Sequence, residues 1–156
     1  MYAQRQDVAV VGAKILYPDD SIYHGGIVLG IRDSFAFAYQ GYDKDAEGYM
    51  GRLYYAHNIS AVTGGCLMIE TNIFNELSGF DTLMDEACRD VDLCLKARKQ
   101  GYLNILNPYC VIYNCGAITK KISNDTFDNK WIDRLKRVDP YYNPNFDTDK
   151  ANYSIK

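Results

Sequence analysis

The chain has 156 residues, with 17 Lys or Arg side chains against 20 Asp or Glu side chains and a net charge of -3. This length makes about one domain with a buried core, and the charge balance argues against a surface that binds polyanions such as nucleic acid. No stretch approaches the roughly 20 apolar residues of a membrane span, and the N-terminus lacks the basic-then-apolar order of a signal peptide. We therefore expect one soluble, cytoplasmic domain spanning residues 1–156.

The first third of the chain predicts short strands and turns. Residues 8–14 are an apolar run typical of a buried strand. Residues 18–21 read PDDS, a turn signal that predicts a hairpin or tight reversal. Glycines bracket a further apolar piece at 27–29. Residues 32–58 mix aromatic, glycine and charged residues without a period, which predicts a long surface segment.

Regular structure is expected again from Ile59. Residues 59–63 and 66–69 predict two strands, separated by Gly64 and Gly65. Thr71 is the expected N-cap of a short helix that a glycine ends at position 79.

The last third predicts two helices and two strands. A helix is expected over residues 90–100, with Gly101 at its stop position. Two strands, 104–106 and 109–113, are split by a proline, and a second helix is expected over 126–138. The tail beyond it reads as irregular. Strands interleaved with helices indicate an α/β fold with a mixed sheet and flanking helices.

The five cysteines form no Cys-x-x-Cys pair and leave one unpaired: Cys66, Cys88, Cys94, Cys110 and Cys115. This pattern is typical of reduced, mostly buried thiols in a cytosolic protein. Metal binding by these thiols is the disfavoured alternative.

Asp90 falls on the apolar side of the expected helix. A helical wheel places it near Cys94 and Ala97, whereas Asp92 and Lys96 fall on an outward polar stripe. Asp92 lies four residues before Lys96, the favourable order for a solvent-exposed ion pair.

An inward-facing acid in a first helical turn has two explanations. Asp90 can cap the helix by accepting backbone N–H groups, a role worth about 1 kcal/mol. It can also be a carboxylate at a pocket edge, kept ionised by the helix N-terminus and ready to accept a proton. Spacing alone favours the cap.

Several spaced motifs resemble family 2 glycosyltransferases, in particular the rhamnosyltransferase-like enzymes of surface polysaccharide biosynthesis in the cell envelope. The motifs are residues 11–26, 58–66, 79–81, 90–96 and 139–146, which read VGAKILYPDDSIYHGG, NISAVTGGC, GFD, DVDLCLK and DPYYNPNF. The resemblance covers nearly the whole chain.

The resemblance implies a partial GT-A fold and an inverting transfer from a nucleotide-diphospho-sugar to a saccharide or lipid-linked acceptor. Asp90 matches the position of the family's catalytic base. Neighbouring residues are the expected substrate-binding set: Thr63, Gly64, Gly65, Arg89 and Asp92.

Two positions depart from the family's pattern. Arg89 stands where these enzymes commonly carry an acid, so it would either pair with Asp90 and lower its basicity or point to solvent. Asn114 stands where they often carry a histidine near the metal and diphosphate, and asparagine is a poorer transition-metal ligand.

The family's nucleotide-binding N-terminal half, with the Asp-x-Asp that grips a divalent cation, has no counterpart here. The Asp-x-Asp triplets at 43–45 and 147–149 do not follow a buried strand. We therefore expect the acceptor-side, base-carrying portion of a catalytic domain, inactive by itself, with Mg²⁺ or Mn²⁺ needed by the full-length enzyme and no metal firmly bound by this chain.

The expected partners are a nucleotide-sugar donor and a glycan acceptor, with no nucleic acid. The full-length protein would work in the cytoplasm, with peripheral association at the inner face of the membrane as an option. The chain alone is expected to self-associate through an exposed apolar face. The alternatives are a non-catalytic carbohydrate-binding or assembly module derived from the same fold, and a structural domain that pairs with another chain.

Overall fold

The computed structural model describes residues 2–116 and 125–156. Its strands are β1 (Val8–Leu16), β2 (Ile22–His24), β3 (Ile27–Ile31), β4 (Ser34–Phe37), β5 (His57–Ile59), β6 (Leu67–Ile69) and β7 (Leu103–Tyr113). Its α-helices are α1 (Thr71–Glu76), α2 (Glu86–Lys99) and α3 (Asp125–Leu135), with short 3-10 turns η1 (Tyr2–Gln4) and η2 (Tyr49–Gly51). The expected α/β class, with a mixed sheet and flanking helices, is confirmed for these residues.

The sheet is built around β1. Its strand order is β2-β1-β7-β5, and β6 also pairs with β1. β1 runs parallel to β7 and antiparallel to β2 and β6. Every residue of β1 except Val11 is buried, which explains why the strand reads as a continuous apolar run rather than an alternating one. The antiparallel β1–β2 pair confirms the reversal predicted by the PDDS turn.

β7 corrects the expectation of two strands split by a proline. It runs unbroken through Pro108, and its pairing with β1 jumps from Asn107 opposite Ala13 to Val111 opposite Lys14. This bulge leaves the proline outside the regular ladder, where its missing N–H costs no hydrogen bond.

The helices lie where the sequence predicted them, with shifted ends. α2 begins at Glu86, four residues before the expected start, because Asp85 takes the N-cap position and Glu86 places an acid in the first turn. In α1 the N-cap position is held by Glu70, so Thr71 is not the cap. Gly101 has φ +95°, the left-handed conformation expected of a residue just beyond a helix end.

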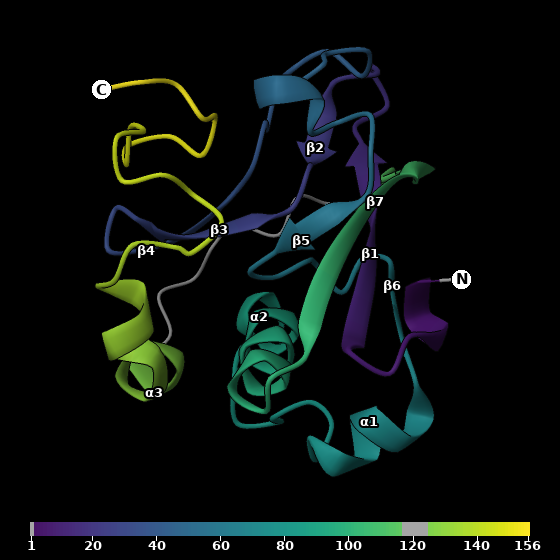
Figure 1. Ribbon diagram of the computed structural model, residues 1–156, viewed down its shortest axis with the longest axis vertical. Coiled ribbons are helices and arrows are strands. Elements are labelled where there is room, and N and C mark those ends of the chain that lie inside the picture. The colour runs from purple at the N-terminus through teal and green to yellow at the C-terminus, as the bar shows by residue number, and fades with distance from the viewer. Residues whose placement is uncertain (1, 117–124) are drawn as a thin grey trace.

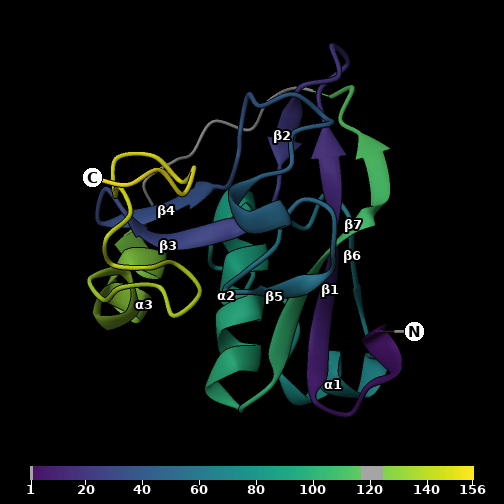
Figure 2. The same ribbon diagram turned by 45° about the horizontal axis from the view of Figure 1, so that its top comes forward.

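Two hydrophobic clusters hold the elements together. The larger lies between the sheet, α2 and α3, and Figures 1 and 2 both place α3 on the side of α2 away from β7. The smaller joins the region after β4 to the C-terminal tail through Tyr39, Leu53, Tyr142 and Tyr153. The expectation of a surface segment over residues 32–58 is therefore wrong in part, because aromatic side chains of the tail bury its inner residues.

The cysteines are less buried than expected. Cys88 and Cys94 are buried, Cys66 is half-buried, and Cys110 and Cys115 are exposed. Within residues 2–116 and 125–156, no helix is both long enough and apolar enough to cross a bilayer.

Candidate functional site

Asp90 joins α2 to the turn that follows β5. It is the fifth residue of α2 and only 8% exposed. Its Oδ2 accepts a hydrogen bond from the Gly64 N–H at 2.6 Å, and its Oδ1 accepts one from the Val91 N–H at 2.8 Å. Asp90 is therefore not at the first turn and not the N-cap, as the capping hypothesis required. Its partner outside the helix is the 63–65 turn.

Burial changes the protonation behaviour of Asp90. The loss of solvent raises the pKa of its carboxyl, while hydrogen bonds from the Gly64 and Val91 N–H groups and from the Thr63 side chain oppose the rise without cancelling it. A carboxylate with a raised pKa is a stronger proton acceptor than an ordinary aspartate. A raised carboxyl pKa is one of the ways in which enzymes tune a general base.

His24 fixes the other end of the same turn. Its ring is fully buried, and its Nε2 accepts the Thr63 N–H at 3.2 Å, so the ring proton lies on Nδ1, 3.3 Å from the Ala13 carbonyl oxygen. Burial lowers the pKa of His24 to about 4, which keeps the imidazole neutral and able to accept at Nε2. The partner of His24 lies 39 residues away, so no local spacing signals the link.

Glycine at position 64 allows the turn to approach α2. A Cβ placed there would lie 3.3 Å from the Asp90 Cβ, tighter than most real contacts. Gly64 and Gly65 are both exposed, whereas Thr63 beneath them is buried. The structure thus brings together four of the six predicted site residues, with the carboxylate directly under a solvent-exposed backbone turn.

Arg89 does not pair with Asp90, although both residues are described. Its Nε donates to the Met84 carbonyl oxygen at 2.8 Å, and its side chain is half-buried. Both sequence alternatives, pairing with Asp90 and pointing freely to solvent, are therefore wrong. Arg89 instead ties the loop before α2 to the helix.

Asp92 is the clearest correction. It was expected on an outward stripe, but its side chain is 0% exposed. Its Oδ1 accepts from the Trp131 indole N–H at 2.8 Å and lies 2.8 Å from the Lys130 Nζ. Its Oδ2 lies 3.3 Å from the Lys96 Nζ, so the predicted partner is correct and the predicted exposure is wrong. The wheel failed because α3 covers this side of α2, and a wheel contains no information about a second helix.

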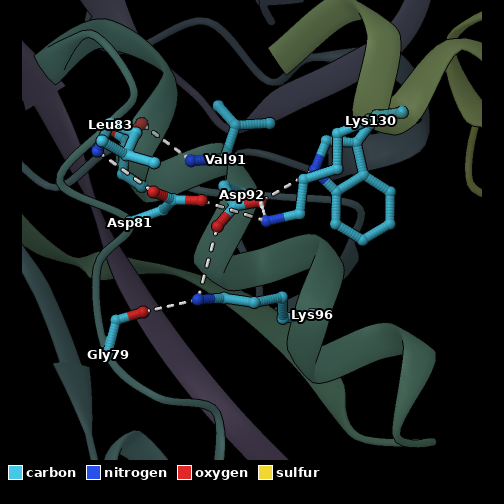
Figure 3. Close-up of polar contacts among 9 residues, drawn as sticks. Gly79, Asp81, Leu83, Val91, Asp92, Lys96 and Lys130 are labelled. Atoms are coloured by element: carbon cyan, nitrogen blue, oxygen red, sulfur yellow. Dashed lines mark hydrogen bonds and ion pairs between the residues drawn. The ribbon is translucent and has the colours of Figure 1, made fainter. Parts of the chain in front are cut away.

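The two lysines around Asp92 extend the network to the loop before α2. Figure 3 shows Lys96 and Lys130 reaching Asp92 from different sides, with Gly79 and Asp81 beyond them. Lys96 donates to the Gly79 carbonyl oxygen at 2.6 Å, and Lys130 lies 3.4 Å from Asp81 Oδ2. Asp92 is closed off by these partners, so it does not offer a substrate contact. Its place in the molecule is the junction of α2, α3 and the loop.

Asp90 and Asp92 do not form a metal site. One faces the 63–65 turn and the other faces α3, so their carboxylates do not converge. Across the part of the chain that the structure describes, no group of three or more His, Cys, Asp or Glu side chains could hold a metal ion. The described residues therefore offer no three-ligand site for the Mg²⁺ or Mn²⁺ that the family resemblance implies for a full-length enzyme.

The remaining metal candidates have local partners instead. Asp43 and Asp147 each accept the N–H of the residue two positions on, an Asx turn. Asn114 Oδ1 accepts the Gly116 N–H at 3.0 Å in the same manner. These contacts explain the Asp-x-Asp triplets as turn chemistry.

The chain is similar to two curated proteins. It is 34% identical over 166 residues to the uncharacterized protein y4gI of Sinorhizobium fredii, an alignment covering 98% of this chain and 18% of that protein. It is 26% identical over 153 residues to the O-antigen biosynthesis protein RfbC of Myxococcus xanthus, covering 91% of this chain and 12% of that protein. The chain thus spans less than a fifth of the length of either relative. No family model matches, and no solved structure matches.

Proposed function

We propose that this chain is the acceptor-side, base-carrying part of an inverting family 2 glycosyltransferase with a GT-A-like fold. The observation that carries the proposal is the buried carboxylate of Asp90, held under an exposed glycine turn. The similarity to an O-antigen biosynthesis protein supports a role in surface polysaccharide assembly.

The proposed step is a single displacement at the anomeric carbon of the donor sugar. An acceptor hydroxyl oxygen forms the new bond while the bond to the nucleotide diphosphate breaks, and the hydroxyl proton passes to Asp90. The two oxygens of the carboxylate offer about four lone-pair sites, and the Gly64 N–H, the Val91 N–H and the Thr63 side chain occupy three, so one site remains for a substrate proton. The exposed backbone of the 63–65 turn would border the acceptor.

The two halves of the complete enzyme would contribute different groups to this reaction. A nucleotide-binding half would supply the donor and the cation that neutralises the diphosphate. The residues described here would orient the acceptor and take its proton.

The test of the proposal is Asp90→Asn in a polypeptide that joins this chain to its donor-binding half. Loss of a general base predicts a fall in turnover of about 10²–10⁴-fold, with the donor affinity unchanged in calorimetry. Glu86→Gln, an exposed acid in the first turn of α2, is the matched control and should leave turnover unaltered. Normal turnover by the Asp90→Asn enzyme would remove Asp90 from the base role.

The pH profile gives an independent readout. The base must be ionised to accept a proton, so the rate should fall as the pH drops through the pKa of Asp90. Because that pKa is raised above the ordinary aspartate value of 3.8, the acidic limb should lie above 3.8 and should vanish in the Asp90→Asn enzyme.

A non-catalytic carbohydrate-binding or assembly module is the second candidate. It is favoured by the hydrogen bonds that Asp90 accepts from Gly64 and Val91, because these bonds alone would explain the carboxylate as a group that holds the 63–65 turn in place. The two proposals separate in one experiment. The complete polypeptide of a module binds an acceptor glycan and transfers no sugar from a labelled donor, whereas that of a glycosyltransferase transfers it.

A further inference from the structure

A surface pocket of about 170 Å³ lies beside the far end of α2 from Asp90. Arg98 is eight residues beyond Asp90 in the same helix, or about 12 Å along the helix axis at 1.5 Å per residue. The pocket is lined by Leu29 of β3, Leu95 and Arg98 of α2, Arg134 of α3, and Arg137 to Pro140 of the segment after α3. It is therefore separate from the candidate transfer site.

Three of the lining residues are arginines: Arg98, Arg134 and Arg137. The only lining acid is Asp139, which is 3% exposed. Its Oδ2 accepts the Leu29 N–H at 2.8 Å and its Oδ1 accepts the Tyr141 N–H at 2.8 Å. Within the described residues, no carboxylate lies within ion-pairing distance of any of the three guanidinium groups. A chain of net charge -3 thus places three arginines around one pocket, and among the described residues none of them pairs with a carboxylate.

Arg98 is held in place before any ligand arrives. Its Nη1 donates to the Ser60 hydroxyl oxygen at 2.8 Å, and its guanidinium lies over the Tyr141 ring, 4.7 Å from the ring centroid. A guanidinium carries five N–H donors in a fixed plane, so most of the Arg98 donors remain for an anion. This preorganisation lowers the entropy cost of binding.

Helix dipoles alone do not account for the cluster. Arg98 and Arg134 both lie in the last turn of a helix, where any cation is stabilised by the negative helix end. That effect does not distinguish arginine from lysine. Lys99 and Lys136 are adjacent in sequence to pocket residues, yet neither lines the pocket. Every basic residue of the lining is an arginine.

We propose that this pocket binds a phosphate group. Planar guanidinium groups match phosphate oxygens with paired N–H···O bonds, and three of them can balance a dianion that a single surface arginine does not hold. Leu29 and Leu95, which are 5% and 3% exposed, add buried apolar residues to the lining. The phosphate can belong to a soluble molecule or to a lipid headgroup, since both present the same oxygens.

The test is a titration of the chain with inorganic phosphate, followed through the arginine side-chain N–H signals in NMR spectra. We expect saturable shifts with a dissociation constant on the order of 1 mM or tighter. Arg134→Gln and Arg137→Gln change exposed side chains, so the fold should persist, as unchanged backbone spectra would verify. Each should weaken phosphate binding about tenfold or more.

Lys136→Gln is the matched control, because it removes one positive charge between the two arginines without touching the pocket. It should leave phosphate affinity nearly unaltered. Equal weakening by Lys136→Gln and Arg134→Gln would overturn the proposal, since the anion would then respond to net charge alone. So would unsaturated, arginine-independent shifts at about 10 mM phosphate.

A second arm separates the two sources of the phosphate. Co-sedimentation with phosphatidic acid vesicles, absent with phosphatidylcholine vesicles and lost in Arg134→Gln, would assign the pocket to a lipid headgroup. Phosphate binding without such co-sedimentation would assign it to a soluble phosphate compound.

Discussion

The buried carboxylate of Asp92 shows how one side chain connects two helices. Removing a carboxylate from water costs several kcal/mol, and the cost is offset only by well-placed charges and hydrogen bonds. Asp92 has two lysine ammonium groups and the Trp131 indole N–H around it, at 2.8–3.3 Å. Two of these three partners come from α3, so the charge is stable only while α3 is docked. Asp92 therefore couples the packing of α3 to the folding of the rest of the chain.

Asp92→Ala should strongly destabilise the protein. It removes a buried ion that three donors surround, and losing one member of such a group costs about 3 kcal/mol. Trp131 is the only tryptophan in the chain and bonds directly to Asp92, so its fluorescence reports both urea unfolding and the docking of α3. Asp133→Ala, an exposed acid on α3, should change the free energy of unfolding by less than about 0.5 kcal/mol. An equally small effect for Asp92→Ala would mean that Asp92 is an ordinary surface ion-pair partner.

At the scale of elements, the strand β1 and the segment after β5 make one close contact. A Cβ added at Gly12 would lie 2.5 Å from the Val62 Cβ and 2.7–2.8 Å from its two methyl groups. These distances are shorter than real contacts allow, so β1 lies against Val62 only because position 12 has no side chain. Val62 immediately precedes Thr63 and Gly64, so this contact also sets the height of the turn over Asp90.

Gly12→Ala should therefore destabilise the fold and move the turn. Overpacking of this kind costs about 1–3 kcal/mol, and the Gly64 amide signal should shift because its hydrogen bond to Asp90 is disturbed. The double variant Gly12→Ala/Val62→Gly removes the facing atoms, so its loss of stability should be smaller than the sum of the two single losses. If the loss of stability of the double variant in urea denaturation equals the sum of the two single losses, positions 12 and 62 do not clash.

Local sequence patterns predict those helices, strands and turns whose own residues indicate their structure. The apolar run of β1, the turn before β2 and the charged end of α2 all indicate their structure within one window. β7 was missed as a single strand because Pro108 is a strand breaker, and only the partner strand reveals the bulge that accommodates it. The burial of Tyr39 was missed for a similar reason, since its covering residues lie in the tail more than 100 positions later.

The candidate site was likewise predicted only where local sequence patterns identify its residues. Asp90, Thr63, Gly64 and Gly65 were identified from the sequence, and the structure brings them together. The sequence did not reveal that His24 fixes the turn or that α3 buries Asp92. Both depend on contacts between segments about 40 residues apart, whose side chains leave no periodic pattern in the chain.

At the scale of the whole molecule, the described residues leave one edge of the five-stranded sheet open. β5 pairs with β7 only at Asn104, Ile105 and Leu106. From Pro108 to Tyr113 the outer edge of β7 has no strand partner within the described residues, and this half of the strand is largely exposed. Figure 2 shows this end of β7 at the side of the molecule. An open strand edge carries backbone N–H and C=O groups that pair readily with another chain.

We propose that two copies of the chain pair through this edge. Tyr109 and Val111 are 72% and 43% exposed there, so a paired edge would also remove apolar surface from water. Light scattering should give a mass above the 17.8 kDa of one chain, falling to that value on dilution. Tyr109→Lys/Val111→Lys should shift the mass to the monomer, because charges on an edge strand oppose pairing. Met50→Lys, at a position 76% exposed in η2, removes similar apolar surface far from this edge in the sequence and should leave the association intact. A monomeric mass at every concentration, or equal dissociation by Met50→Lys, would show that this edge does not drive association.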